Sequence, residues 1–239
     1  MVRAWQTVRV VRPLYLRPSA ALRHSSTSTQ TSCTRWLVRP PSPAAPRECP
    51  TPLVLLRTPG LGYGASPESS EPWKVWADMF ALRGYTTVEV DVGVSVPLVA
   101  ESEQAGIKQA ADTLDAQLRR LLVPFAPVII ASGPACLVAQ AYVSDYRAGG
   151  LVVLEPPPDE DPRAEAKPFA WPAFRFEPRF PILVMPPPGG EEGVRTSRLG
   201  MQALDEPGGR GVSVIVEKDG PRGEETRMDV ERWLDWSGY

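Results

Sequence analysis

The segment PVIIASGPACLVAQAY, residues Pro127–Tyr142, decides the fold class of this 239-residue chain. Its first apolar residues, Val128–Ile130, are β-branched and predict a buried strand. The alanine- and leucine-rich residues at its end predict a helix. A turn of small residues, Ala131–Ala135, joins the two. Such a strand–turn–helix unit is where α/β enzymes place a nucleophile or bind a phosphate.

The same alternation of apolar runs and helical patterns extends from residue 52 to the end of the sequence. The other predicted strands are Leu53–Arg57, Thr86–Val92, Leu151–Glu155, Pro181–Met185 and Val212–Glu217. The other predicted helices are about residues 72–83, 101–122, 194–204 and 224–236. This order predicts an α/β fold with a mostly parallel sheet of about six strands and helices on both faces.

The turn resembles the nucleophile elbow of the α/β-hydrolases, G-x-S-x-G, and the AQAY helix after it is similar to that family as well. The order of elements resembles the family from its third strand to its last helix, over about residues 52–239. The resemblance implies an α/β-hydrolase-like domain at 48–239, with a short excursion at 156–180 in the position of the family's cap.

The resemblance also implies where a catalytic site would lie, and the expected residue types are absent there. Gly133 aligns with the nucleophile, Ser132 lies one residue too early, and Pro134 follows. The family's oxyanion loop usually reads His-Gly and supplies an N–H, but here the matching residues are Pro59 and Gly60. Proline has no N–H. We therefore interpret both segments as a vestigial elbow and a vestigial oxyanion loop.

A general base for a triad is missing too. The sequence has one histidine, His24, and the place after the last predicted strand reads Glu217-Lys218-Asp219-Gly220-Pro221. The resemblance would put the acid at Glu191 or Glu192, and a serine–lysine pair with Lys218 stays open. Without an imidazole near the elbow, a Ser-His-Asp triad cannot form. The sequence therefore disfavours catalysis.

A nucleotide site is the alternative for the first loop. Gly60–Ala65 fits G-x-G-x-x-A after a strand, and Asp91 lies near the end of the next strand. The residues SPESSEP separate this loop from the next predicted helix, and Glu68 and Glu71 would lie beside the phosphates. The three cysteines, Cys33, Cys49 and Cys136, lack zinc-site spacing. We expect no cofactor and no metal.

The first 47 residues differ in composition from the rest of the chain. They carry eight arginines and no acid before Glu48, which leaves 18 basic and 28 acidic residues after them. This composition predicts a transit peptide and disordered basic segment over 1–47, mitochondrial import to the matrix, and a cleavage region at Ala20–Ser28. A basic tail for an acidic partner is the alternative. The net-acidic remainder disfavours nucleic-acid binding.

No apolar run reaches the roughly 20 residues that cross a bilayer, so the sequence predicts a soluble protein without a transmembrane segment. An aromatic group would cover the site or anchor a partner; its members are Phe169, Trp171, Phe174, Phe176 and Phe180. The sequence thus predicts a non-catalytic mitochondrial protein, a binding or structural subunit of a protein complex. Two alternatives stay open. One is a serine hydrolase or acyltransferase that acts on an ester or acyl substrate with unconventional residues, and the other is a carrier of a small apolar molecule in the vestigial pocket.

Overall fold

The structure of the chain, a computed structural model, describes residues 31–61, 73–94, 104–121, 125–162, 171–177, 179–205, 211–217 and 223–239. The strands are β1 (Thr31–Arg39), β2 (Cys49–Arg57), β3 (Tyr85–Val94), β4 (Val128–Ser132), β5 (Gly150–Leu154), β6 (Ile182–Met185) and β7 (Val212–Val214). The helices are α1 (Trp73–Leu82), α2 (Gln104–Arg120), α3 (Ala135–Asp145), α4 (Glu191–Thr196), α5 (Arg198–Asp205) and α6 (Gly223–Ser237).

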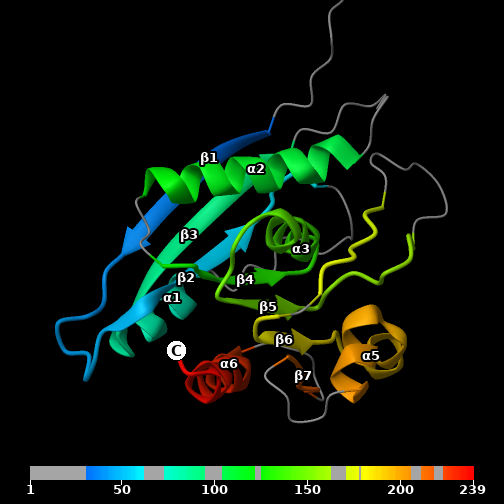
Figure 1. Cartoon of the computed structure of the whole chain (residues 1–239). Coiled ribbons are helices and arrows are strands. Elements are labelled where there is room, and N and C mark those ends of the chain that lie inside the picture. The colour runs from blue at the N-terminus through cyan, green and yellow to red at the C-terminus, as the bar shows by residue number, and fades with distance from the viewer. Residues whose placement is uncertain are drawn as a thin grey trace, which may run out of the picture.

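Within these described residues, the strands form one sheet in the order β1-β3-β2-β4-β5-β6-β7 (Figure 1). The strands β2 to β7 run parallel to one another, and β1 pairs with β3 antiparallel at one edge. Because parallel strands end at the same edge of a sheet, the residues that follow β2, β4 and β5 lie together there. The predicted fold class, a mostly parallel α/β sheet with helices on both faces, is confirmed.

Helices cover both faces of the sheet (Figure 1). On one face, α1 and α6 bury Trp76, Phe80 and Leu234 against the strands. On the other face, α2 and α3 form the second core. The side chains of β4 alternate between these cores, with Ile130 in the first and Ile129 in the second. A strand buried on both faces is apolar throughout, which is why the sequence alone identifies this one.

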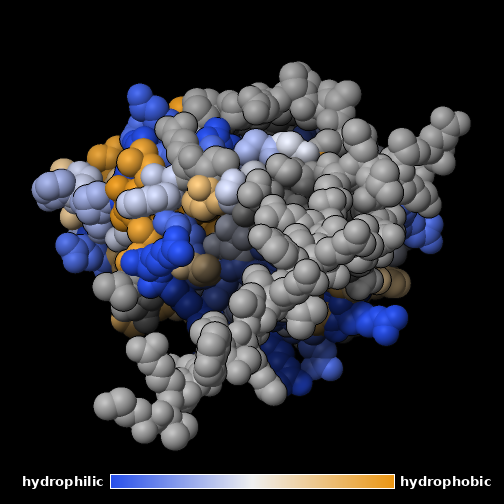
Figure 2. Space-filling model, turned by 90° about the horizontal axis from the view of Figure 1, so that it is seen from above, coloured by the Kyte–Doolittle hydropathy of each residue, from blue (hydrophilic) through white to orange (hydrophobic). Residues whose placement is uncertain are grey.

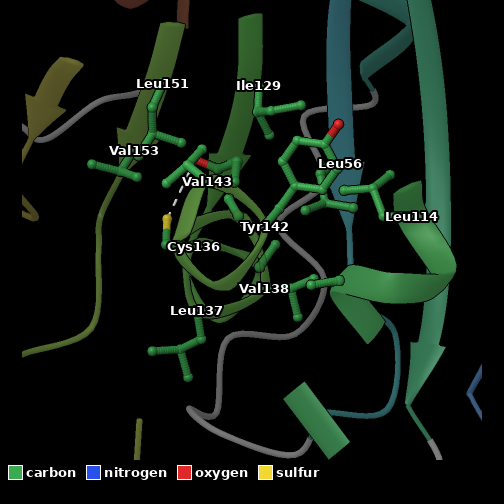
Figure 3. Packing of buried hydrophobic residues seen from close by; sticks show 14 of the residues in the cluster. Leu56, Leu114, Ile129, Cys136, Leu137, Val138, Tyr142, Val143, Leu151 and Val153 are labelled. Carbon is green, nitrogen blue, oxygen red and sulfur yellow. Dashed lines mark hydrogen bonds between the residues drawn. The ribbon is translucent and has the colours of Figure 1, made fainter. Parts of the chain in front are cut away.

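Helix α3 is enclosed on nearly every side. Eight of its 11 residues are buried. Figure 3 shows Val138 and Tyr142 on the side of α3 that faces Leu114 of α2, while Leu137 points away from the strands. Apolar burial on this scale contributes about 1.5–3 kcal/mol for each large side chain. The packing therefore fixes the position of α3 and of the turn before it.

The prediction of a disordered basic segment over residues 1–47 is wrong for residues 31–39, which form β1. The pairs from Thr31↔Val94 to Arg39↔Thr87 join β1 to β3. The guanidinium of Arg39 lies 3.2 Å from the carboxylate of Glu89 on β3 and also forms a hydrogen-bonded ion pair with Asp78 of α1. Composition pointed to a targeting segment, but pairing with the open edge of β3 decides the structure of these residues. Residues 1–30 lie outside the described part of the chain.

The proline-rich stretch before β2, expected to be a linker, packs against the turn between α1 and β3. The Ser42 N–H donates to Ala81 O at 2.8 Å, and the Cys49 N–H donates to Gly84 O at 2.8 Å. A Cβ on Gly84 would lie 1.9 Å from Arg47 O, and its φ of 97° also requires glycine. Arg47 in turn pairs with Asp235 of α6 at 2.5 Å. The folded domain therefore begins before the predicted boundary at residue 48.

The helix predicted over residues 194–204 is two helices, α4 and α5, separated at Ser197. The backbone of Ser197 is extended, with a ψ of 155°. Its hydroxyl donates to Val194 O at 2.7 Å and accepts from the Gly200 N–H at 3.1 Å. Ser197 is therefore the N-cap of α5, and this competition of a serine side chain with the helix backbone explains the break.

The surface keeps some large apolar side chains exposed, among them Trp36, Leu37 and Val38 of the edge strand β1. Figure 2 looks down on the molecule from above Figure 1 and shows hydrophobic atoms gathered toward one side of that face. None of the helices in the described ranges is long and apolar enough to cross a membrane.

Candidate active site

The turn between β4 and α3 has the shape of an elbow. Gly133 follows the last residue of β4, Ser132, and adopts a φ of 56°, in the left-handed region that glycine tolerates. The Gly133 N–H donates to Leu154 O of β5 at 2.8 Å. A Cβ built on Gly133 meets no atom within 4 Å. The predicted elbow therefore has open space where a nucleophile would stand, and Gly133 places no side chain there.

The loop expected to correspond to the oxyanion loop lies at the same edge of the sheet. It follows β2, which pairs with β4 through Leu56↔Ala131. Pro59 and Gly60 are both exposed in this loop. The structure thus brings the two predicted loops together. Neither Pro59 nor Pro134 has an N–H that could donate to an oxyanion. The first N–H of α3 is that of Ala135.

Ser132 places a hydroxyl at this edge. It ends β4, its side chain is exposed, and it pairs in register with Leu154 of β5. The resemblance of the turn to the hydrolase elbow puts Ser132 one residue before the nucleophile position. Neighbouring strands lie about 5 Å apart, so the residue after Leu154 lies next to the end of β4.

That residue is Glu155, which the sequence analysis did not single out. Among the described residues it is the one non-glycine residue with a positive φ, 50°. Its N–H donates to Met185 O of β6 at 2.8 Å. The only signal in the sequence is an acid that ends a predicted strand before Pro156, and such a pattern does not predict a left-handed backbone. The structure thus places a strained carboxylate residue beside the elbow.

The other acids expected at the site lie elsewhere. Glu191 and Glu192 are exposed in the first turn of α4. Glu217 follows β7 and accepts a hydrogen bond from the Thr226 hydroxyl at 2.9 Å. His24, Ser95 and Lys218 lie outside the described residues.

Asp91, considered above as part of a nucleotide site, is held by Arg57. The guanidinium Nε lies 2.8 Å from Oδ1 of Asp91, and Nη2 lies 2.7 Å from Oδ2. A bidentate pair of this geometry fixes both side chains. It joins the ends of β2 and β3 next to the candidate site.

Cys136 follows the elbow on α3 and is buried. Its thiol donates to Ala131 O at 3.4 Å and to Leu154 O at 3.5 Å. Burial raises the pKa of this thiol above its usual range. A thiolate is the reactive form of cysteine, so Cys136 stays an inert core residue.

The aromatic group of the excursion packs inward. Trp171, Phe174, Phe176 and Phe180 are partly buried against the core that contains α3. The Trp171 indole N–H donates to Pro158 O at 3.0 Å and ties the two limbs of the excursion together. These side chains therefore pack against the protein's own core, and the two predicted roles, cover of the site and anchor for a partner, stay predictions. Phe169 lies outside the described residues.

A cavity of about 610 Å³ opens away from the elbow, beside the edge strand β7. Its walls include Leu204 of α5, Val212 and Val214 of β7, and Trp233 and Trp236 of α6. The sequence left open a carrier that holds a small apolar molecule in the pocket beside the elbow. The 610 Å³ cavity lies elsewhere in the molecule, so it does not support that alternative. Within the described ranges, no group of three or more His, Cys, Asp or Glu residues is placed to hold a metal ion.

Comparisons with known proteins bear on the fold. No family model matches the sequence, and no curated protein matches it. The solved structure of Thermogutta terrifontis esterase 2 phosphonylated by cyclosarin is similar, with 13% identity and a TM-score of 0.55 over 89% of this chain and 95% of that one. A putative α/β hydrolase of unknown function from Agrobacterium tumefaciens has 13% identity and a TM-score of 0.50 over 84% of this chain and 89% of that one. The chain spans 44% of a probable hydrolytic enzyme from Pseudomonas aeruginosa, a match whose TM-score of 0.39 supports no conclusion.

These comparisons correct the function predicted from the sequence. The prediction of a non-catalytic binding or structural subunit is wrong against them, because the similar structures include an esterase and a putative hydrolase and nothing in them indicates a non-catalytic role. The alternative of a serine hydrolase or acyltransferase agrees with them better. Identities of this size show the fold alone and assign no reaction. The chain has the α/β-hydrolase fold.

Proposed function

We propose that the protein hydrolyses an ester or transfers its acyl group at the carboxyl edge of the sheet, with Ser132 as nucleophile and Glu155 as base. The observation that supports this most is the left-handed backbone of Glu155, φ 50°, beside the left-handed Gly133. A strained backbone costs free energy and persists only where the surrounding structure holds it. Such residues cluster at active sites. The exposed Ser132 hydroxyl lies on the strand next to Glu155.

The proposed chemistry is acyl transfer in two steps. The Ser132 Oγ attacks the ester carbonyl carbon and forms a C–O bond, while the Glu155 carboxylate takes the hydroxyl proton. The alkoxide leaves with that proton, and an acyl-serine remains. Water or an acceptor alcohol then attacks the acyl carbon, and Glu155 again takes the proton. The Ser132 Oγ–acyl bond breaks, Glu155 returns that proton to Oγ, and the acid or the new ester leaves. The Ala135 N–H at the start of α3 and the positive end of that helix dipole are the groups that would face the oxyanion.

A fluorophosphonate probe tests the proposal directly, because it reacts covalently with a nucleophilic serine. We expect labelling of Ser132 in the wild-type chain and none in Ser132→Ala. Hydrolysis of p-nitrophenyl acetate should fall at least 10-fold in Ser132→Ala and in Glu155→Gln. The matched control is Ser144→Ala on α3, whose hydroxyl donates to Gln140 O, and it should keep full labelling. A carboxylate is a weaker base than imidazole, so turnover should be slow.

Two results would overturn the assignment. Unchanged labelling in Ser132→Ala, or a label that maps to Ser95, would place the nucleophile elsewhere. The absence of both labelling and ester hydrolysis in the folded wild-type protein would remove the proposed activity altogether.

We also propose that residues 1–30 direct import into mitochondria. The support is compositional: this part of the chain carries five arginines and no acid. Because β1 begins at Thr31, cleavage is expected before that residue, within or near Ala20–Ser28. A fluorescent fusion should give mitochondrial signal, and the mature N-terminus should map upstream of Thr31. A cytosolic fusion, or a mature protein that lacks β1, would refute the proposal.

A further inference from the structure

A small pocket lies between α3 and the described part of the excursion, apart from Ser132 and Glu155. Its volume is about 140 Å³, and it is lined by Leu137 and Gln140 of α3, by Asp159, Trp171 and Phe174 of the excursion, and by Arg198 of α5. Figure 3 shows Leu137 pointing away from the strands, and this side chain forms part of the pocket wall. The pocket is therefore walled by apolar and aromatic groups and contains one guanidinium.

Arg198 is held in the pocket by neutral groups. Its Nη1 donates to Phe176 O at 2.9 Å, its Nη2 lies 3.4 Å from Gln140 Oε1, and its Cζ lies 4.3 Å from the centre of the Phe176 ring. A guanidinium has five N–H donors, so these two hydrogen bonds leave donors for a ligand. Burial lowers the pKa of Arg198, while the nearby charge of Asp159 acts in the opposite direction.

Asp159 does not neutralise this charge by an ion pair. Its carboxylate instead accepts a hydrogen bond from the backbone N–H of Arg198 at 2.6 Å. The charge of Arg198 is thus half-buried among an amide, a carbonyl and a ring, where attraction to an anion is much stronger than in water. A buried charge of this kind is stabilised by an opposite charge.

Gln140 supplies a second polar group. Its residue is 5% exposed, and its amide oxygen faces Arg198. The same amide carries an NH₂ group that can donate. A pocket with apolar walls and a few convergent donors is typical of a small-molecule site.

We infer that this pocket binds the carboxylate of a small organic acid, with Arg198 and Gln140 as donors and the carbon chain against Leu137, Trp171 and Phe174. The planar fork of arginine matches a carboxylate. Asp159 disfavours a dianion such as phosphate more than it disfavours a monoanionic carboxylate. The inference stands on the pocket itself and does not depend on the proposed ester chemistry at Ser132.

Titration of the full chain with butyrate, a monoanionic carboxylate at neutral pH, tests the inference. The signals are calorimetric heat and the NMR resonance of the Trp171 indole N–H, assigned through Trp171→Phe. We expect saturable binding, no binding of neutral butyramide, and weaker binding of inorganic phosphate. Arg198→Gln should weaken butyrate binding at least 10-fold. Arg195→Gln is the matched control, because Arg195 lines the other cavity and its loss changes the net charge equally.

Arg198 also fastens the excursion, so a second variant keeps the test decisive. Gln140→Glu places a carboxylate of the same shape against the guanidinium, which should preserve the fold and abolish butyrate binding. Binding that survives in this variant, or equal binding in Arg198→Gln, would overturn the inference. So would the absence of saturable binding in the wild-type chain, or tighter binding of phosphate than of butyrate. Ser132→Ala should bind butyrate normally, which separates this result from the proposed activity.

Discussion

Glu155 and Gly133 are neighbours at the carboxyl edge, and both have a left-handed backbone. Glycine adopts this region without steric cost, whereas a residue with a Cβ loses roughly 1–2 kcal/mol there. The hydrogen bond from the Glu155 N–H to Met185 O holds the strained residue in place. At the scale of single residues, the fold therefore holds Glu155, next to the elbow, in a backbone conformation that costs free energy.

Replacement of Glu155 by glycine should relieve this strain. We expect Glu155→Gly to raise the free energy of unfolding by about 1 kcal/mol, because glycine accepts the positive φ. Ester hydrolysis should be lost in the same variant. Urea denaturation measures the first effect. Glu160→Gly, at an exposed position of the excursion, serves as control and should not stabilise the protein. A less stable Glu155→Gly protein would contradict the strain argument.

Pro134 is the second residue whose replacement is informative. Pro134→Ala adds a backbone N–H directly after Gly133, where the hydrolase fold uses one for the oxyanion. One such donor contributes a factor on the order of 10²–10³ in established enzymes, so ester hydrolysis should rise at least 10-fold. The exposed Pro46→Ala provides the comparison and should leave the rate unchanged. A rate that does not rise would place the oxyanion outside the reach of this N–H.

At the scale of elements, β1 is the strand whose attachment depends on charge as well as on backbone pairing. Arg39 connects β1 to α1 and β3 through Asp78 and Glu89. The side chain of Glu89 is only 5% exposed, while that of Asp78 is 55% exposed. The pair with Glu89 is therefore the one that matters for stability, since loss of the cation leaves a buried carboxylate without its partner.

Arg39→Gln should lower the free energy of unfolding by about 2–4 kcal/mol, in line with loss of one member of a buried ion pair. Asp78→Asn should cost less than about 1 kcal/mol, because that carboxylate is solvated. The double variant Arg39→Gln with Glu89→Gln should recover much of the loss. Chemical denaturation of the three proteins provides the comparison. Equal effects of Arg39→Gln and Asp78→Asn would show that Glu89 is not the partner that counts.

At the scale of the whole molecule, tyrosines report on both cores. Burial raises the pKa of Tyr142, in the core with α3, to about 12, and burial raises that of Tyr239, beside Trp233 of α6, to about 12. The unfolded value is about 10. A raised folded pKa means that the native state keeps its proton longer, so stability is full below about pH 10 and falls as pH rises toward 12.

Denaturation midpoints measured from pH 8 to 12 should therefore decline above about pH 10. Tyr142→Phe should flatten this decline, by about 2 kcal/mol at its largest, because phenylalanine has no proton to lose. Tyr239→Phe should flatten it as well, but it also removes the hydrogen bond to Gly149 O and lowers stability at neutral pH. A decline of the same slope in Tyr142→Phe would assign the alkaline sensitivity to other groups.

Much of the fold could be predicted from the sequence because its signals are local. The strands that are buried on both faces are apolar runs, such as Val128–Ile130, and the turn at Gly133 is marked by small residues. Strand β1 was missed because its arginines and hydroxyl residues are also typical of a targeting segment. The break at Ser197 was missed because helical periodicity continues across it.

The sequence by itself determined the layered α/β fold and the elbow turn, since these follow from residue types and their spacing. Only the tertiary structure decided which groups meet. Glu155 is strained because β6, which begins at Ile182, accepts its N–H, and Arg198 meets Gln140 across 58 residues of sequence. Such contacts depend on the positions of distant elements in space. The candidate base and the acid-binding pocket therefore appear only when the sheet and its helices are assembled.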